Sequence, residues 1–99
     1  MTTAKAKDGS TVSLTGKSIT SSTKTETTTI ALSAIHTVSY KVHEGWATTH
    51  QLVITFGNET TNWDGASYVT SRGYRDWYFA NKYADQVRLM HDAIQRAIS

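Results

Sequence analysis

The sequence predicts an α+β fold in which short antiparallel strands are closed by one C-terminal amphipathic helix. Apolar and polar residues alternate from 38 to 42 and again from 52 to 56, which is typical of strands with one buried face. From Asn81 onward the apolar residues recur about every 3.6 positions, as in an amphipathic helix. Because this helix comes last, it cannot connect two parallel strands, and we expect an antiparallel sheet.

Length and composition limit the class of protein. The 99 residues predict one domain, and 38% hydrophobic with 18% charged residues suffices for a modest core. Without cysteine, the chain has no disulfide, cysteine-ligated zinc or thiol nucleophile. No run approaches the roughly 20 apolar residues of a membrane span, and a signal peptide is not recognisable, so we expect a cytoplasmic location. A net charge of +2 is too small to indicate binding to nucleic acid or membrane lipid.

The first third of the chain predicts a leader followed by Thr-rich strands. Residues 1–10 have no large apolar residue after the first position, so we expect a flexible leader there and a single domain over residues 11–99. Residues 11–31 are dominated by Thr and Ser, which fits either a disordered linker or short strands. Strands are favoured, because Thr is β-branched and linkers are usually rich in Gly, Pro, Gln and Glu. Gly16 and Lys17 supply a turn.

The two alternating segments in the middle of the chain predict a hairpin. Their apolar faces must coincide, which places Glu44 opposite His50 and leaves residues 46–48 as the tip. Glu44 and His50 are then expected to form a charge-assisted pair at the mouth of the hairpin. Trp46 is expected to be exposed at the tip, the alternative being that its ring folds back over the hairpin. The expected pairs are Val42 with Leu52, Tyr40 with Ile54 and Val38 with Phe56.

The region after this hairpin predicts a turn and a further strand. Gly57 and Asn58 mark the turn, and residues 59–63 are interpreted as the strand, which ends at residues 64–65. Residues 66–73 fit either a strand or an ordered loop, and the pattern does not choose between them.

A last strand and the helix complete the prediction. Residues 74–80 alternate so that Trp77 and Phe79 lie on the buried side, and Trp63 is expected in the same core. Asn81 is a suitable N-cap for the helix. The apolar stripe of the helix comprises Tyr83, Val87, Met90, Ile94 and Ile98, reinforced by Ala84 and Ala97.

The order of these elements resembles that of pleckstrin-homology-like (PH-like) domains. Small bacterial members carry a motif resembling I-x-L-x-x-I-x-x-V, and Ile30, Leu32, Ile35 and Val38 stand at those spacings. The resemblance covers residues 11–98. It implies a strongly bent antiparallel sheet or partly open barrel of about six to seven strands, closed by the helix. It also implies a scaffold for lipid, peptide or protein binding that in some bacterial members forms homo-oligomers, and it assigns no function by itself.

The sequence offers no constellation for catalysis, a cofactor or a metal. It has neither a Gly-x-Ser-x-Gly nucleophile elbow nor a Gly-rich phosphate loop, and its acidic residues are dispersed, so we expect neither an enzyme nor a cofactor. His36, His43 and His50 recur at seven-residue intervals. An odd separation places strand residues on opposite faces, so no metal site is expected from this recurrence.

The remaining candidates are surface contacts. Trp46 is the leading one, because Trp is enriched at interface hot spots. An Arg pair beside Tyr74 suits a carboxylate or a protein surface, the alternative being solvated turn arginines. Residues 25–29 are expected to form an open sheet edge that can pair with another strand. The expected partner-contact residues are Lys41, Trp46, His50, Arg72, Tyr74 and Arg75.

These observations predict a non-catalytic PH-like protein-interaction or assembly module that self-associates through sheet edges or binds another protein. The alternative is a small phage or mobile-element inhibitor or accessory protein that blocks a larger nucleic-acid-processing complex by surface contact. A third hypothesis is weak binding of lipid or nucleic acid through Lys41, Arg72 and Arg75. Phosphoinositide-binding relatives carry a basic cluster in the loop between the first two strands. This chain has only Lys17 there, with Lys24 further on, so the resemblance implies a poor anion site.

Overall fold

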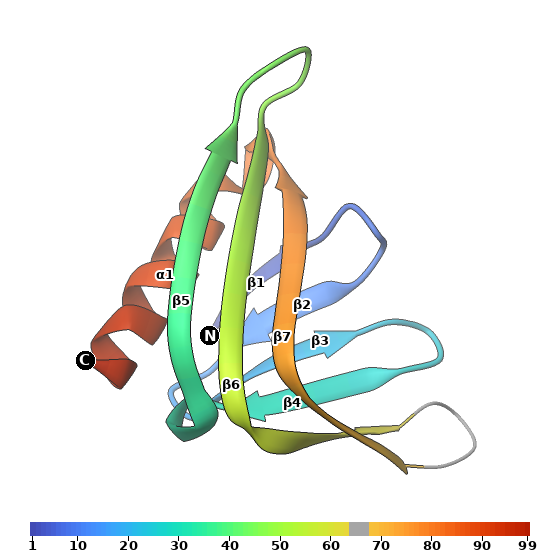
Figure 1. The fold of residues 1–99 in the computed structure, drawn as a ribbon. Coiled ribbons are helices and arrows are strands. Elements are labelled where there is room, and N and C mark those ends of the chain that lie inside the picture. The colour runs from blue at the N-terminus through green and yellow to red at the C-terminus, as the bar shows by residue number, and fades with distance from the viewer. Residues whose placement is uncertain (64–67) are drawn as a thin grey trace.

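The described part of the chain forms seven strands, two short 3₁₀ helices and one α-helix (Figure 1). The structure is a computed structural model that describes residues 1–63 and 68–99, with side chains described for residues 1–57 and 73–99. The strands are β1 (Thr2–Lys5), β2 (Thr11–Leu14), β3 (Ser18–Ser22), β4 (Thr27–Ala31), β5 (Ile35–His43), β6 (Thr49–Trp63) and β7 (Tyr68–Ala80). The 3₁₀ helices are η1 (Leu32–Ala34) and η2 (Asn81–Tyr83), and the α-helix is α1 (Ala84–Ile98).

These strands lie in two antiparallel sheets, β1–β4 and β5–β7, which run in different directions in Figure 1. Each of β1 to β4 pairs with the next, and β6 lies between β5 and β7. The two sheets join where the end of β6 pairs with β4, from Thr27 opposite Trp63 to Thr29 opposite Thr61. The expected α+β class with antiparallel pairing and a C-terminal helix is therefore confirmed.

The strands that the structure describes do not close into a barrel, so that part of the fold prediction is not confirmed. On the side away from β4, the strand pairing between the sheets in the described residues is one isolated bridge between Ala6 and Phe79. Beside it the Lys7 N–H donates a hydrogen bond to the Tyr78 carbonyl at 2.7 Å, and Lys7 Nζ donates to Thr49 Oγ1 at 3.0 Å. These contacts connect the two sheets on this side without a continuous strand ladder.

Residues 1–10, expected to be a flexible leader, instead contribute strand β1 to the first sheet. Ala4 and Ala6 are buried, and Ser10 is buried at the start of the next strand. This strand is covered by α1, which packs against β1. The turn to β2 is held by Asp8, whose carboxylate accepts a hydrogen bond from the Ser10 N–H at 2.9 Å, and by Gly9 with a positive φ of 95°.

The Thr-rich segment forms strands, as expected. Val12, Ile19 and Ile30 point into the core, while Thr and Ser side chains line the other face. Hydroxyl groups on that face lie opposite each other across strands, as in Thr20–Thr29 at 3.4 Å. The β-branched side chains therefore cover the outer face of a half-buried sheet, as their propensity predicts.

The β5–β6 hairpin forms with the expected faces but with a register that differs from the predicted one by two residues. Val42 lies opposite His50 in place of Leu52, and the tip spans residues 44–48. A shift of two residues keeps every side chain on its face, so the hydrophobic pattern alone does not distinguish the two registers. The observed register leaves Val42 48% exposed beyond the core and brings His50 into it.

Strand β6 continues through the predicted turn at Gly57 and Asn58. The ladder between β6 and β7 shifts register between Phe56 and Thr60, so this region is an irregularity within one long strand and not a turn between two strands. Gly57 lies against the imidazole of His36, and a Cβ at this position would overlap that ring. A side chain at this position would therefore require the exposed His36 ring to move.

Strand β7 is longer than the predicted strand. It begins at Tyr68, so residues 68–73 are strand and not loop. Residues 64–67 lie outside the described residues; they comprise the predicted strand end at 64–65 and the start of the predicted segment 66–73. The side chain of Trp63 lies outside them as well. Trp77 and Phe79 are buried as expected.

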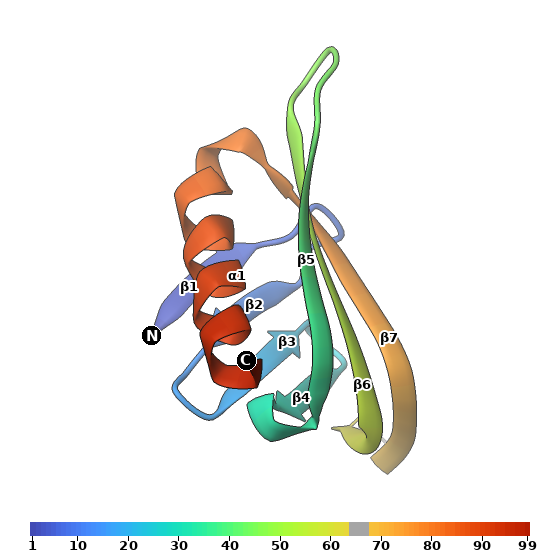
Figure 2. The same cartoon turned by 60° about the vertical axis from the view of Figure 1, so that its left-hand side comes forward.

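Helix α1 packs against β5 and β1 and so covers the open side between the two sheets (Figure 2). Its stripe of Val87, Met90 and Ile94 is completely buried, as predicted. Asn81 does not cap the helix, because it lies in η2 and its side chain binds His50. No helix within the described residues combines the length and apolar character needed to cross a membrane.

Candidate functional site

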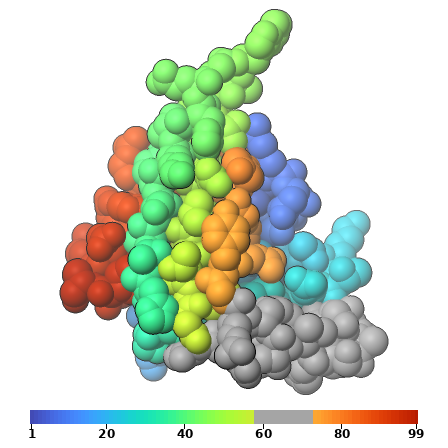
Figure 3. All heavy atoms as spheres, viewed as in Figure 1, coloured from blue at the N-terminus to red at the C-terminus, as the bar shows by residue number. Residues whose placement is uncertain are grey.

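The tip of the β5–β6 hairpin projects from the body of the molecule (Figures 1 and 3). Trp46 at this tip is fully exposed, as the sequence predicted, and its ring does not fold back over the hairpin. Glu44 and Gly45 beside it are exposed as well. An indole in this position contributes no packing to the fold, so it is available for contact with another molecule.

The base of this hairpin is fixed on its inner face by a hydrogen-bonded chain around His50. The His50 side chain is only 4% exposed, and its ring stacks on Tyr40 with centroids 5.8 Å apart. Its Nε2–H donates to Asn81 Oδ1 at 2.8 Å, and the Tyr40 hydroxyl donates to Nδ1 at 2.6 Å when the ring is neutral. The predicted Glu44–His50 pair is therefore wrong, because the two-residue register difference moves His50 away from Glu44 and into the core.

The outer face of the β5–β7 sheet carries a second polar chain. His43 donates from Nε2 to Gln51 Oε1 at 2.8 Å, and Gln51 Nε2 donates to Asp76 Oδ2 and to the Tyr78 hydroxyl, each at 3.1 Å. These bonds join β5, β6 and β7 side by side. They fix the strands on the outer face, as the His50 chain does on the inner face.

Exposed aromatic rings stand on this outer face. Tyr74 is 59% and Tyr78 is 43% exposed, and the Tyr78 ring lies 6.1 Å from that of His43. Desolvation of the Tyr74 phenol, followed by the hydrogen bond and negative charge of Asp76, raises the pKa of Tyr74 above its ordinary value. Because both rings are exposed, they are accessible to another molecule on this face.

The structure does not bring the predicted contact residues onto one surface. Lys41 and Tyr74 lie on the outer face of the sheet, on β5 and β7. Arg75 points to the opposite face, where its guanidinium lies 3.8 Å from the Glu26 carboxylate. The side chain of Arg72 lies outside the described residues. With His50 buried, Lys41, Trp46 and Tyr74 remain as exposed candidates on the hairpin and its sheet.

Sequence reasoning placed Asp76 and Tyr78 on the face opposite the buried Trp77 and Phe79, because these residues alternate along the strand. It did not connect them with Gln51, which is buried and binds both of them. The pairing of β6 with β7 was needed to place Gln51 between them. The predicted open edge at residues 25–29 is also wrong over Thr27–Thr29, since these residues pair with the end of β6.

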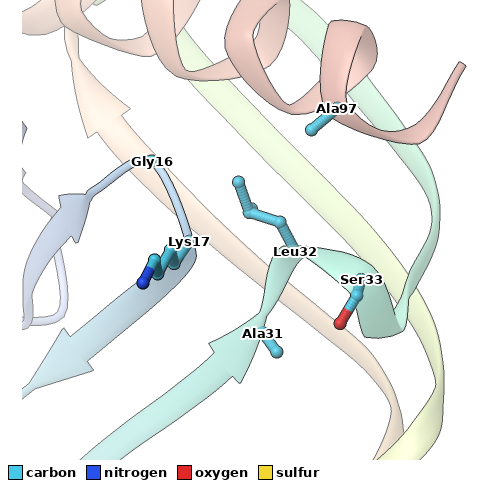
Figure 4. Close-up of a pocket in the computed structure, with 6 residues that line it drawn as sticks. All are labelled: Gly16, Lys17, Ala31, Leu32, Ser33 and Ala97. Atoms are coloured by element: carbon cyan, nitrogen blue, oxygen red, sulfur yellow. The ribbon is translucent and has the colours of Figure 1, made fainter.

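Two depressions lie elsewhere on the molecule. A groove of about 500 Å³, here called the β2–β3 groove, lies between the turn after β2, the start of η1 and the end of α1 (Figure 4). Leu32 and Ala97 face each other across it, with Lys17 at its rim. A smaller depression of about 280 Å³ on α1 surrounds the exposed Leu89. The residues lining the β2–β3 groove are Gly16, Lys17, Ala31, Leu32, Ser33 and Ala97.

In the described residues no three His, Cys, Asp or Glu side chains gather in a way that would hold a metal ion. His43 and His50 lie on opposite faces of the sheet, and His36 lies beside Gly57. The described residues thus combine an exposed indole with a sheet whose strands are joined by side-chain hydrogen bonds. Comparisons with family models, with curated proteins and with solved structures found no match.

Proposed function

We propose that the chain is a non-catalytic, PH-like protein-interaction and assembly module that makes its contact through the β5–β6 hairpin. The observation that carries this proposal is Trp46, a fully exposed indole at the end of a projecting hairpin. Trp contributes more than most residues to protein interfaces, because its large rigid ring buries much apolar area at little cost in side-chain entropy. Both faces of the hairpin base are fixed by hydrogen-bonded side chains, so the tip is presented from a rigid support.

The PH-like part of the proposal is supported by the order of elements. Successive antiparallel strands, a central hairpin and one C-terminal helix follow each other as in the resemblance drawn from the sequence. The β4–β6 pairing joins the two sheets, and buried residues of both belong to one hydrophobic cluster. The fold by itself assigns no activity, so the function is inferred from the exposed surface.

Self-association through a sheet edge forms part of the same proposal. The edge is strand β5, because Thr27–Thr29 of the Thr-rich segment first expected to be open pair with β6. In the described residues β5 pairs with β6 on one side, and it ends the strand order of its sheet. Its first part packs against α1, whereas Lys41 to His43 extend toward the projecting tip and are exposed. An exposed edge of this kind accepts a strand of a second copy or of a partner protein. A cytoplasmic location is included in the proposal.

The test compares the wild-type chain with Trp46→Ala by light scattering over about a hundredfold range of concentration. We expect the wild-type mass to rise with concentration and the variant to need about tenfold more protein for the same rise. The melting temperature should be unchanged, since the indole makes no contact with the core. A large drop in melting temperature would show that the ring stabilises the fold, and a wild-type chain that stays monomeric throughout would rule out self-association.

Ionic strength distinguishes this proposal from binding to a polyanion. Affinity that depends on contacts with phosphate falls steeply as salt rises, whereas an indole-centred protein contact changes little. We therefore expect the same association curves at low and at moderate salt. A loss of association by several orders of magnitude at moderate salt would instead favour nucleic acid or an anionic lipid as the partner.

A further inference from the structure

We infer that the chain assembles head to tail, with the Trp46 tip of one copy seated in the β2–β3 groove of the next. This inference rests on the proposed function and names the partner as a second copy of the same chain. Its starting point is that the molecule carries both a projecting indole and an apolar groove, at sites that cannot meet within one copy.

The placement of the two features favours a contact between copies. The hairpin tip lies at one end of the molecule, and the turn after β2, η1 and the end of α1 lie at the other end in both ribbon views (Figures 1 and 2). A contact between two different surfaces is heterologous, so each copy keeps one free tip and one free groove. Repetition then gives a ring if the rotation between copies closes, or an open filament if it does not.

The groove has the chemistry that an indole requires. Ala31, Leu32 and Ala97 provide apolar contact for the ring, and Ser33 and Lys17 add polar groups, in an open depression of about 500 Å³. Its rim is held by the turn after β2, where the Leu32 N–H donates to the Lys17 carbonyl at 2.9 Å. The groove is therefore anchored by the backbone, and Leu32 and Ala97 face into it (Figure 4).

The negative charge of Glu44 favours binding of the tip at this groove over binding at the smaller depression on α1. Glu44 lies two residues before Trp46 at the tip, so any site that takes the indole must also accommodate a carboxylate. The β2–β3 groove is lined in part by Lys17, and no acidic residue is among the described residues that line it. The depression around Leu89 is bordered by Asp85 and Asp92, which repel Glu44 more than the single Arg88 attracts it.

The experiment uses two full-length variants that each lack one half of the contact. Trp46→Ala removes the indole and keeps the groove, and Ala97→Glu fills the groove with a negative side chain and keeps the indole. We expect each variant alone to be monomeric at concentrations where the wild type associates. Mixed in equal amounts, they should form a heterodimer of twice the chain mass and nothing larger, because the mixture contains one intact tip and one intact groove per pair.

Matched variants control for exposure and charge. Leu89→Ala removes an exposed apolar side chain that lies outside both surfaces of the contact, and Gln95→Glu adds the same charge to an exposed position of α1. Both should associate like the wild type, and circular dichroism should show that all four variants are folded.

The outcomes separate this inference from the proposed function. A wild type that associates while the mixed variants stay monomeric would refute the tip-in-groove contact and leave the interaction module in place. The same holds if Ala97→Glu associates normally. A wild type that is monomeric throughout would contradict self-association itself, and this inference with it.

Discussion

At the scale of single residues, His50 is a polar side chain within an apolar core, and two side chains from other elements make this possible. Tyr40 and Asn81 each bind one ring nitrogen. A buried polar group without a partner costs about 1–3 kcal/mol, so His50 is stable there only while both partners are present. The alternation of His50 with Leu52 indicates the core face of β6, but it fits equally an exposed His at the hairpin mouth. Burial of His50 was therefore not predictable before the contacts with Tyr40 and Asn81 were known.

Asp8 gives the first prediction at this scale, because its charge stabilises the turn between β1 and β2. The Ser10 N–H, followed by smaller effects that include the Ser10 hydroxyl and the charge of Arg75, holds the pKa of Asp8 below its ordinary value of 3.8. A carboxyl whose pKa is lower in the folded state stabilises the fold above the unfolded pKa and loses this contribution as pH falls through the folded value. The stability of the wild type should therefore decline in acid partly through Asp8.

The measurement is urea unfolding of the wild type and of Asp8→Asn between about pH 7 and pH 2. The asparagine keeps an oxygen that accepts the Ser10 N–H but carries no charge. We expect the wild type to be the more stable protein at neutral pH, and the difference in unfolding free energy to shrink below about pH 4. A difference that stays constant through this range would show that the Asp8 charge does not interact with the folded turn.

At the scale of elements, periodicity predicted most strands and the helix because each has one buried face. The stripe of α1 and the burial of Trp77 and Phe79 followed directly from this pattern. Register was not predictable in the same way, since a shift of two residues leaves every side chain on its face. The strand through Gly57 was also missed, because glycine followed by asparagine is a common turn signal and the close approach of His36 is visible only in three dimensions.

The prediction at this scale concerns the buried stripe of α1. Val87→Asp places a carboxylate among the apolar side chains of the core, so we expect the domain to unfold. Leu89→Asp introduces the same side chain two positions away on the exposed face of the helix, and its melting temperature should stay within a few degrees of the wild type. Circular dichroism and thermal melting distinguish the two. A soluble Val87→Asp variant with a cooperative wild-type melt would refute the packing of α1 described above.

At the scale of the whole molecule, the first ten residues hold the two sheets together on the side opposite the β4–β6 junction. β1 pairs with β2, and the chain just beyond it bridges to β7 at Ala6 and Phe79. The sequence did not indicate this, because small residues such as Ala4 give no periodic hydrophobic signal. The candidate site was predictable only in part from the sequence. The exposed tip followed from local pattern, whereas the β2–β3 groove is built from three segments that are distant in sequence.

The last prediction tests this integrating role of the N-terminal strand. Ala4 is buried against the core, whereas Lys5, its neighbour on the same strand, is exposed. Ala4→Asp should lower the free energy of unfolding by about 2 kcal/mol or more, because the carboxylate is buried without a partner. Lys5→Asp should change it by about 0.5 kcal/mol or less. Urea unfolding measures both, and a pair of variants with equal, wild-type stability would mean that residues 1–10 do not pack on the domain in solution.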